Sequence, residues 1–185
     1  MSWTQSIEAQ ELTAPRSVTA TPDTFKHAFR DHAAGVAVVT ADPGTGPVAL
    51  TATSVFSVSA EPPVLVFSLS ALSSSTPAIR ASESIVVHLL DDRRKDLAVL
   101  ASTSGIDRFA DTAAWTRLPT GEPYFLGVPN WIRASVTQLL TVGASTLVVA
   151  TAEEISDHGD DDAAERRPLV YHNRTWHALG ERSRL

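Results

Sequence analysis

The sequence predicts a β-dominated fold with short helices, and three observations support this. Several segments are rich in β-branched residues or alternate apolar with polar side chains, which is typical of strands. Turn-forming residues separate many of these segments, so hairpins should predominate and the sheet should be mostly antiparallel. No internal repeat or long linker divides the 185 residues. Six or seven strands in one domain are expected to close into a small barrel, which removes exposed sheet edges.

The chain begins with a predicted arm and one helix. Residues 1–20 lack clear periodicity and are interpreted as an N-terminal arm, with the folded domain spanning residues 21–182. Thr21, Pro22 and Asp23 form a typical helix start, with a capping hydroxyl, a proline in the first turn and an early acid. Gly35 is expected to end this helix.

The second predicted strand, Val48–Ala60, has an unusual polar face. Its apolar side chains alternate with Thr51, Thr53, Ser57 and Ser59, and no charge appears before Glu61. A face in contact only with water would usually carry some Lys or Glu. The alternation predicts one buried face and one face of small hydroxyls.

The remaining elements follow from local patterns. Prolines end the second strand, because proline cannot donate to a ladder. Asp92 is expected to cap a helix, and residues 105–129 are expected to be irregular. The other predicted elements are strands at Val36–Ala41, Val64–Ser70 and Ile85–Leu90, a helix at Pro77–Ser82, a helix at Arg93–Ala101, a hairpin of Trp131–Leu140 with Ser145–Glu153, and a last strand or hairpin at Leu169–Leu179.

Composition excludes several classes of protein. A net charge of −6 and the lack of a basic cluster argue against nucleic acid as a partner. The absence of cysteine excludes disulfides and thiolate chemistry. No signal peptide and no apolar run of membrane-spanning length is found, so no membrane association is expected and the protein is interpreted as cytoplasmic. The acidic segment 157–165 is interpreted as a solvated loop.

Motifs for metal or hydrolytic chemistry are not found. The six histidines lack metal-binding spacing, and no G-x-S-x-G motif occurs. Neither a metal site nor catalytic side chains are therefore predicted.

Three segments each leave two interpretations open. The run from Ser73 to Thr76 is either an ordinary helix cap or part of an anion site. Asp107-Arg108-Phe109 is either a surface turn or a cation beside an aromatic ring. The rings between Tyr171 and His177 are either packing residues or site residues. Strand alternation would place Tyr171 and Trp176 on opposite faces.

Together these parts resemble the flavin reductase-like, FMN-binding split-barrel family, which includes reductase components of two-component flavin monooxygenases. The resemblance covers residues 22–180 in the family's order, and its most specific piece is T-A-x-S-x-F-x-S-V-S-x-x-P-P, from Thr51 to the Pro62-Pro63 pair. The other matching segments are Gly35–Thr40, Ser75-Thr76 with Ile79-Arg80, Asp107-Arg108-Phe109, and Pro168–His172 with Trp176-His177.

The resemblance implies a homodimeric, six-stranded antiparallel Greek-key barrel with FMN, or in some relatives FAD, at the dimer interface. It implies hydride transfer from NADH or NADPH to the flavin, which itself carries the chemistry, and supply of reduced flavin to a partner monooxygenase. The implied flavin-binding residues are Thr51, Ala52, Thr53, Ser54, Ser68, Leu69, Ser70, Ser75, Thr76, Arg108, Phe109, Tyr171 and Trp176. Ser145 and His172 are the implied contacts of the nicotinamide.

Two departures from the family pattern keep alternatives open. The turn before the last long strand reads Gly143-Ala144-Ser145, without the acid that many members carry there. A flavin-binding protein without nicotinamide turnover, acting as a carrier or redox partner, is therefore the second hypothesis, and a ligand-free interaction module is the third. In addition, His88 stands where many members have asparagine, so its role is left open.

Overall fold

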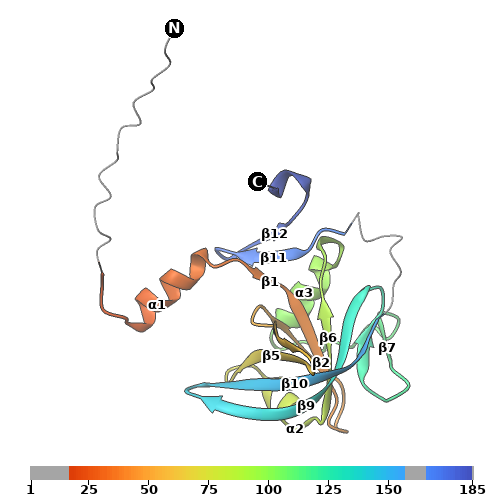
Figure 1. The fold of residues 1–185 in the computed structure, drawn as a ribbon. Helices are drawn as coiled ribbons and strands as arrows, with labels where there is room; N and C mark the ends of the chain where they lie inside the picture. Colours follow the sequence, from red (N-terminus) through yellow and green to blue (C-terminus); the bar gives the residue numbers. More distant parts are fainter. Residues whose placement is uncertain (1–16, 157–165, 185) are drawn as a thin grey trace.

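The computed structural model describes residues 17–156 and 166–184 of the chain. Most of the predicted arm and the predicted acidic loop, residues 157–165, lie outside this range. The described part is built mainly from strands with a few short helices, which confirms the predicted fold class (Figure 1). No described helix is both long enough and apolar enough to cross a bilayer.

The elements agree with most of the predicted segments. The strands are β1 (Ala34–Gly35), β2 (Ala37–Ala41), β3 (Val48–Ala52), β4 (Phe56–Ala60), β5 (Pro63–Ser70), β6 (Ser84–Leu89), β7 (Trp115–Arg117), β8 (Pro123–Phe125), β9 (Asn130–Val142), β10 (Ser145–Ile155), β11 (Leu169–His172) and β12 (Thr175–Ala178). The helices are α1 (Pro22–Ala28), α2 (Thr76–Ala81) and α3 (Lys95–Ser102), with 3₁₀ turns at Phe29–Asp31, Asp92–Arg94 and Glu181–Ser183.

One antiparallel sheet of seven strands organises the molecule. Its strand order is β3-β2-β6-β9-β10-β5-β4, and every neighbouring pair is antiparallel. The long β9–β10 hairpin lies in the middle of the order and curves across the barrel (Figure 1). Two smaller sheets, β1-β11-β12 and β7-β8, pair separately.

The predicted continuous strand Val48–Ala60 is wrong, because the chain breaks it into β3 and β4. These two strands lie at opposite ends of the seven-strand order, joined only by Thr53–Val55. Phe56 and Val58 are 57% and 55% exposed, so the apolar face predicted to be buried is exposed in β4. The alternation continues across the break, and periodicity alone therefore does not reveal it.

Ser54 connects the two ends of the sheet. Its hydroxyl accepts a hydrogen bond from the Ser68 amide of β5 at 2.9 Å. This bond lies beyond the start of β4, where β4 no longer pairs with β5, although β10 still pairs with β5 on its other side. The barrel is therefore split between β3 and β4, and a side chain rather than a ladder joins its ends.

The predicted helix limits need two corrections. Thr21 caps α1 as predicted, but α1 ends at Ala28 and a 3₁₀ turn follows, so Gly35 belongs to β1. The helix buries none of its residues. Asp91, rather than Asp92, accepts the capping bond from the Arg93 amide.

The region predicted to be irregular contains the β7–β8 hairpin. Glu122, just before β8, is 6% exposed and accepts bonds from Ser84 Oγ at 2.6 Å and from Arg133 Nε at 2.8 Å. Burial raises the pKa of Glu122, but hydrogen bonds from Ser84, Thr120 and Arg133 outweigh this and leave it lowered. This carboxylate therefore fastens the hairpin to β6 and β9.

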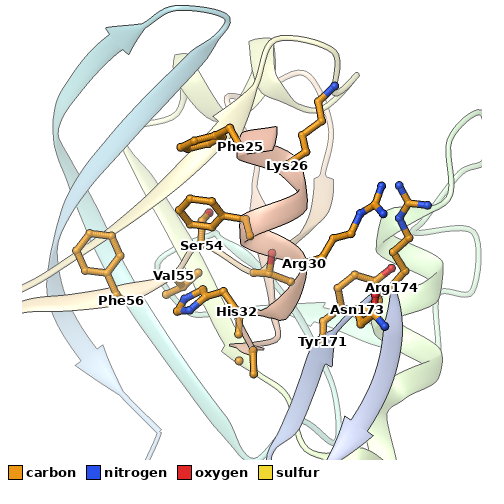
Figure 2. Close-up of a pocket in the computed structure, with 15 residues that line it drawn as sticks. Phe25, Lys26, Arg30, His32, Ser54, Val55, Phe56, Tyr171, Asn173 and Arg174 are labelled. Carbon is orange, nitrogen blue, oxygen red and sulfur yellow. The ribbon is translucent and has the colours of Figure 1, made fainter. Parts of the chain in front are cut away.

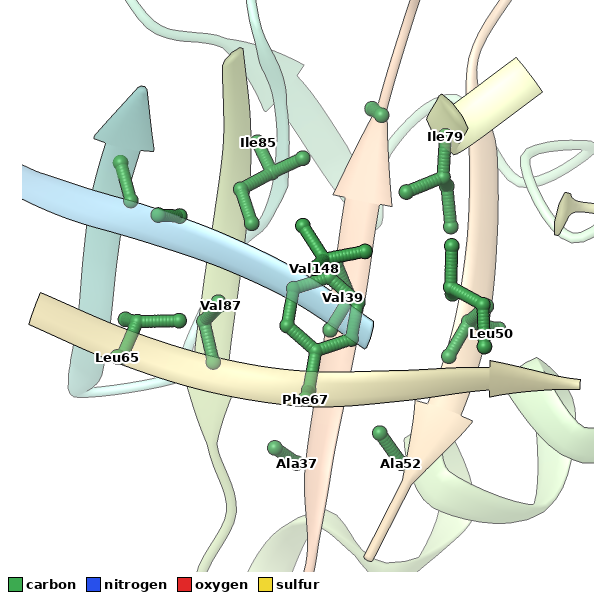
Figure 3. Packing of buried hydrophobic residues seen from close by; sticks show 14 residues of the cluster. Ala37, Val39, Leu50, Ala52, Leu65, Phe67, Ile79, Ile85, Val87 and Val148 are labelled. Carbon is green, nitrogen blue, oxygen red and sulfur yellow. The ribbon is translucent and has the colours of Figure 1, made fainter. Parts of the chain in front are cut away.

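Two apolar clusters form the core. The first lies inside the barrel, where Phe67 packs among side chains from β2, β3, β6, β10 and α2 (Figure 3). The second contains buried residues of α3 and β8 together with Phe109, whose ring stacks on Phe125 at 5.0 Å between centroids. The site described below lies at the edge of the first cluster.

His88, whose role was open in the sequence, is a structural residue of the core. Its ring is fully buried on β6, where Nε2 accepts from the Phe125 amide and Nδ1 lies 3.0 Å from the Val38 carbonyl. Nδ1 must therefore carry the proton and donate it to Val38. The neutral ring links β6 to β2 and β8.

Burial lowers the pKa of His88 to about 4. In the unfolded chain its pKa returns to about 6.5. As the pH falls from 6.5 towards 4, the unfolded chain takes up a proton that the folded state excludes. The contribution of His88 to the free energy of unfolding should therefore fall by about 1.4 kcal/mol per pH unit, and by about 3 kcal/mol in total. Urea unfolding at a series of pH values measures this slope.

His88→Leu should reduce the slope, even if the variant is less stable at every pH. His27→Gln, on the exposed face of α1, is the matched control and should keep the slope. An unchanged slope in His88→Leu would contradict the assignment.

Candidate functional site

A pocket of about 300 Å³ lies where the sheet is split. We call it the hydroxyl pocket, and it is lined by Leu50, Thr51, Ala52, Thr53, Ser54, Ser68, Leu69, Ser70, Ser73 and Ser145. The structure thus brings together the predicted segments Thr51–Ser54 and Ser68–Ser70 with Ser145. These residues come from β3, the crossing to β4, β5 and the start of β10.

Strand register explains this convergence. Ser145, the first residue of β10, pairs with Ser70, the last residue of β5. Ser54 is fixed to Ser68, two residues earlier on the same strand. Residues distant in sequence therefore meet at one end of β5.

The hydroxyls of the pocket fall into two groups. Thr51 Oγ1 donates to the Ala98 carbonyl of α3 at 2.6 Å, Ser54 bonds Ser68, and Ser70 Oγ accepts from the Leu72 amide. These hydroxyls hold the fold together. Among the described residues, no protein group bonds the remaining hydroxyls of the pocket, which belong to Thr53, Ser68, Ser73 and Ser145.

Ser75, Thr76 and Arg108 lie beside the hydroxyl pocket but do not line it. Ser75 Oγ donates to the Ala49 carbonyl at 2.8 Å, and Thr76 Oγ1 donates to the Ser70 carbonyl at 2.7 Å. The Arg108 guanidinium donates to Ser75 Oγ and to the Thr103 carbonyl. Its Nε is buried and has no hydrogen-bond partner within residues 17–156 and 166–184. Phe109 is a core residue, packed against Phe125 and Trp115.

A second, larger pocket of about 850 Å³ opens between α1, β1, the crossing segment and β11 (Figure 2). We call it the α1 pocket. Its lining residues are Phe25, Lys26, Phe29, Arg30, His32, Ala33, Ala34, Gly35, Thr53, Ser54, Val55, Phe56, Tyr171, Asn173 and Arg174. Thr53 and Ser54 line both pockets, so the two cavities adjoin at the split.

The C-terminal hairpin corrects the predicted strand faces. Asn173 and Arg174 form a turn with positive φ, so Tyr171 and Trp176 pair across β11 and β12 on the same face. Their ring centroids are 4.7 Å apart. The same turn brings the ring centroids of His172 and His177 to 5.7 Å from each other. Tyr171 lines the α1 pocket, whereas Trp176 and His172 line neither pocket.

The contribution of α1 and of the hairpin turn to a pocket is not evident from the sequence. Phe25 and Phe29 lie four residues apart, which places them on one helix face but does not say what that face contacts. In the structure these side chains are 60% and 58% exposed and line the α1 pocket. Arg30 and Arg174 belong to no sequence motif. Arg30 lies shortly before β1 and Arg174 shortly after β11, and the antiparallel pairing of these two strands brings the residues near each other.

Comparison with known proteins supports the assignment of the family. Residues 29–180 match the family described as flavin reductase like domain. An NADH:FMN oxidoreductase of Rhodococcus qingshengii is 47% identical over 148 residues, 80% of this chain and 77% of that protein. The reductase subunit of stachydrine N-demethylase from Rhizobium meliloti is 30% identical over 139 residues, covering 75% of this chain and 60% of that protein.

A solved structure shows the same fold. The flavin reductase domain protein from Arthrobacter sp. FB24 superposes with a TM-score of 0.76 at 33% identity, covering 85% of this chain and 94% of that chain. With its β-dominated fold, its split sheet and its match over residues 29–180, this chain belongs to the flavin reductase-like domain family.

Proposed function

We propose that the protein is an NADH-dependent flavin reductase of the cytoplasm that binds FMN and supplies reduced flavin to a partner monooxygenase. The observation that supports this most directly is the convergence of Thr51–Ser54, Ser68–Ser70 and Ser145 on the hydroxyl pocket. The relatives named above, an NADH:FMN oxidoreductase and a demethylase reductase subunit, point to the same activity.

The residues at the split suit a flavin. The pocket offers hydroxyls without protein partners, and its side chains are small enough for a flat ring to approach the backbone. No carboxylate lines either pocket within the described residues, so an anionic phosphate meets no like charge there. The Nε of Arg108, which has no hydrogen-bond partner in the described part of the chain, leaves a buried donor beside the predicted phosphate segment.

The proposed roles follow from these positions. Bound flavin supplies the redox chemistry by accepting a hydride from the nicotinamide. Thr53 and Ser68 bind the flavin edge and ribityl chain, and Ser145 faces the nicotinamide. Arg108, held by Ser75, contributes positive charge for the phosphate. The chain thus binds, orients and shields the reactants.

Two measurements on purified protein test the function. Titration with FMN should produce bound flavin with a perturbed visible spectrum, and NADH oxidation should accelerate when FMN is added. Bound flavin without NADH or NADPH oxidation would instead identify a flavin carrier, the alternative suggested by Ala144. Absence of affinity for both FMN and FAD would reject the proposal.

A pair of threonine substitutions tests the site. Thr53→Val removes a hydroxyl without a protein partner and should weaken FMN binding about tenfold, because a hydrogen bond to the ligand is lost. Thr51→Val removes the bond to Ala98 and should cost about 1 kcal/mol of stability with a smaller effect on binding. Calorimetric titration and urea unfolding measure the two effects. Equal losses of FMN affinity in both variants would contradict this division of roles.

We further propose that the protein is a homodimer, as the family resemblance implies. Large apolar side chains remain exposed on β4 and at the end of β9, including Phe56, Val58, Leu140 and Val142, each at least half exposed. Such side chains in one monomer are typical of an association surface. Light scattering coupled to size exclusion should give twice the monomer mass, and Val58→Glu should shift it towards the monomer. A monomeric mass for the unaltered protein would exclude the dimer.

A further inference from the structure

One side of the α1 pocket carries a concentration of positive charge that the flavin proposal leaves unused. Lys26 and Arg30 come from α1 and the turn after it, and Arg174 comes from the β11–β12 turn. The whole chain has a net charge of −6, so this group of cations is opposite in sign to the net charge of the protein. The same pocket has no acidic lining residue among the described residues.

The two arginines have no carboxylate partner in the described part of the chain, whereas Lys26 lies 3.8 Å from Asp23. Their backbones are held together, because the Asn173 amide donates to the Arg30 carbonyl at 3.0 Å. Figure 2 shows both side chains extending in the same direction on one side of the pocket. Two guanidinium groups without anions, positioned from separate elements, are well suited to bind a phosphate group.

The other side of the pocket is aromatic. The rings of Phe25 and Phe29 lie 4.7 Å apart, and both line the pocket. Both are more than half exposed, so each ring presents a surface to solvent. Exposed rings of this kind can stack on a planar heterocycle.

We propose that the α1 pocket binds the adenylate half of the nicotinamide dinucleotide, with Arg30 and Arg174 on a phosphate and the Phe25–Phe29 pair against the adenine. The inference rests on the proposed function. Adjacency is the connecting observation: Thr53 and Ser54 line both the α1 pocket and the hydroxyl pocket, so a dinucleotide whose nicotinamide lies at the hydroxyl pocket has the α1 pocket as its neighbouring cavity. The volume of about 850 Å³ lies within the usual range for small-molecule sites, roughly 300–1,000 Å³.

The experiment compares substrates that differ only in this half. Steady-state FMN reduction is measured with NADH, with NADPH and with reduced nicotinamide mononucleotide, which lacks the adenylate. The variant combines Arg30→Gln with Arg174→Asn, because residue 174 has φ of 62° and asparagine tolerates that conformation. Lys95→Ala, which removes an exposed cation of α3 outside both pockets, is the charge control.

The double variant should lose about tenfold in kcat/KM for NADH, while the mononucleotide should react at nearly the rate of the unaltered protein. Added salt should lower kcat/KM for NADH more in the unaltered protein than in the variant. A loss of equal size with NADPH would place the pair on the pyrophosphate, and a larger loss with NADPH would place it on the 2′-phosphate.

Equal losses with the dinucleotide and the mononucleotide would overturn the inference. A weaker FMN affinity with an unchanged preference for NADH over the mononucleotide would also overturn it, and would instead place the arginines on the flavin phosphate. Both outcomes leave the reductase activity itself intact, whereas protein that binds no flavin or oxidises no nicotinamide would overturn the proposed function. Circular dichroism and thermal unfolding confirm that the variant is folded.

Discussion

The crossing from β3 to β4 is the constraint on which the site depends. In three residues, Thr53–Val55, the chain leaves one end of the seven-strand order and joins the other. No ladder can form between these strands, and the hydroxyl of Ser54 instead bonds the Ser68 amide. The split therefore leaves backbone and small side chains accessible, and both pockets meet there.

The rest of the barrel keeps this opening in place. Phe67 and its neighbours fill the interior from several strands, while Thr51 connects β3 to α3 through the Ala98 carbonyl. His88 and Glu122 link the β7–β8 hairpin to the sheet through buried hydrogen bonds. Buried polar groups with all their hydrogen bonds made favour a single arrangement of the hairpin on the sheet. Any other arrangement would leave a buried donor or acceptor without a partner, which costs free energy. Neither His88 nor Glu122 lines the hydroxyl pocket or the α1 pocket.

The site itself has the character expected when a cofactor carries the reaction. Its lining contains hydroxyls and small side chains, and the titratable groups with shifted pKa values, Asp42, His88 and Glu122, do not line it. Cations adjoin both pockets, with Arg108 beside the hydroxyl pocket and Arg30 and Arg174 in the α1 pocket. FMN and a nicotinamide dinucleotide, the proposed ligands, both carry phosphates of opposite charge.

Much of this protein follows from short-range rules in its sequence. The Thr21 cap, the prolines that end β4, the β9–β10 hairpin and the hydroxyls of Thr51–Ser54 can all be predicted from local patterns, and the family resemblance joins the hydroxyl segments into one site. Tertiary structure alone decided where the alternating segment breaks, that Thr51 bonds α3 whereas Thr53 remains free, and that Arg30 lies near Arg174. The reason is physical: strand partners and register depend on hydrogen bonds between residues far apart in sequence, and a periodic pattern is the same whichever edge a strand joins.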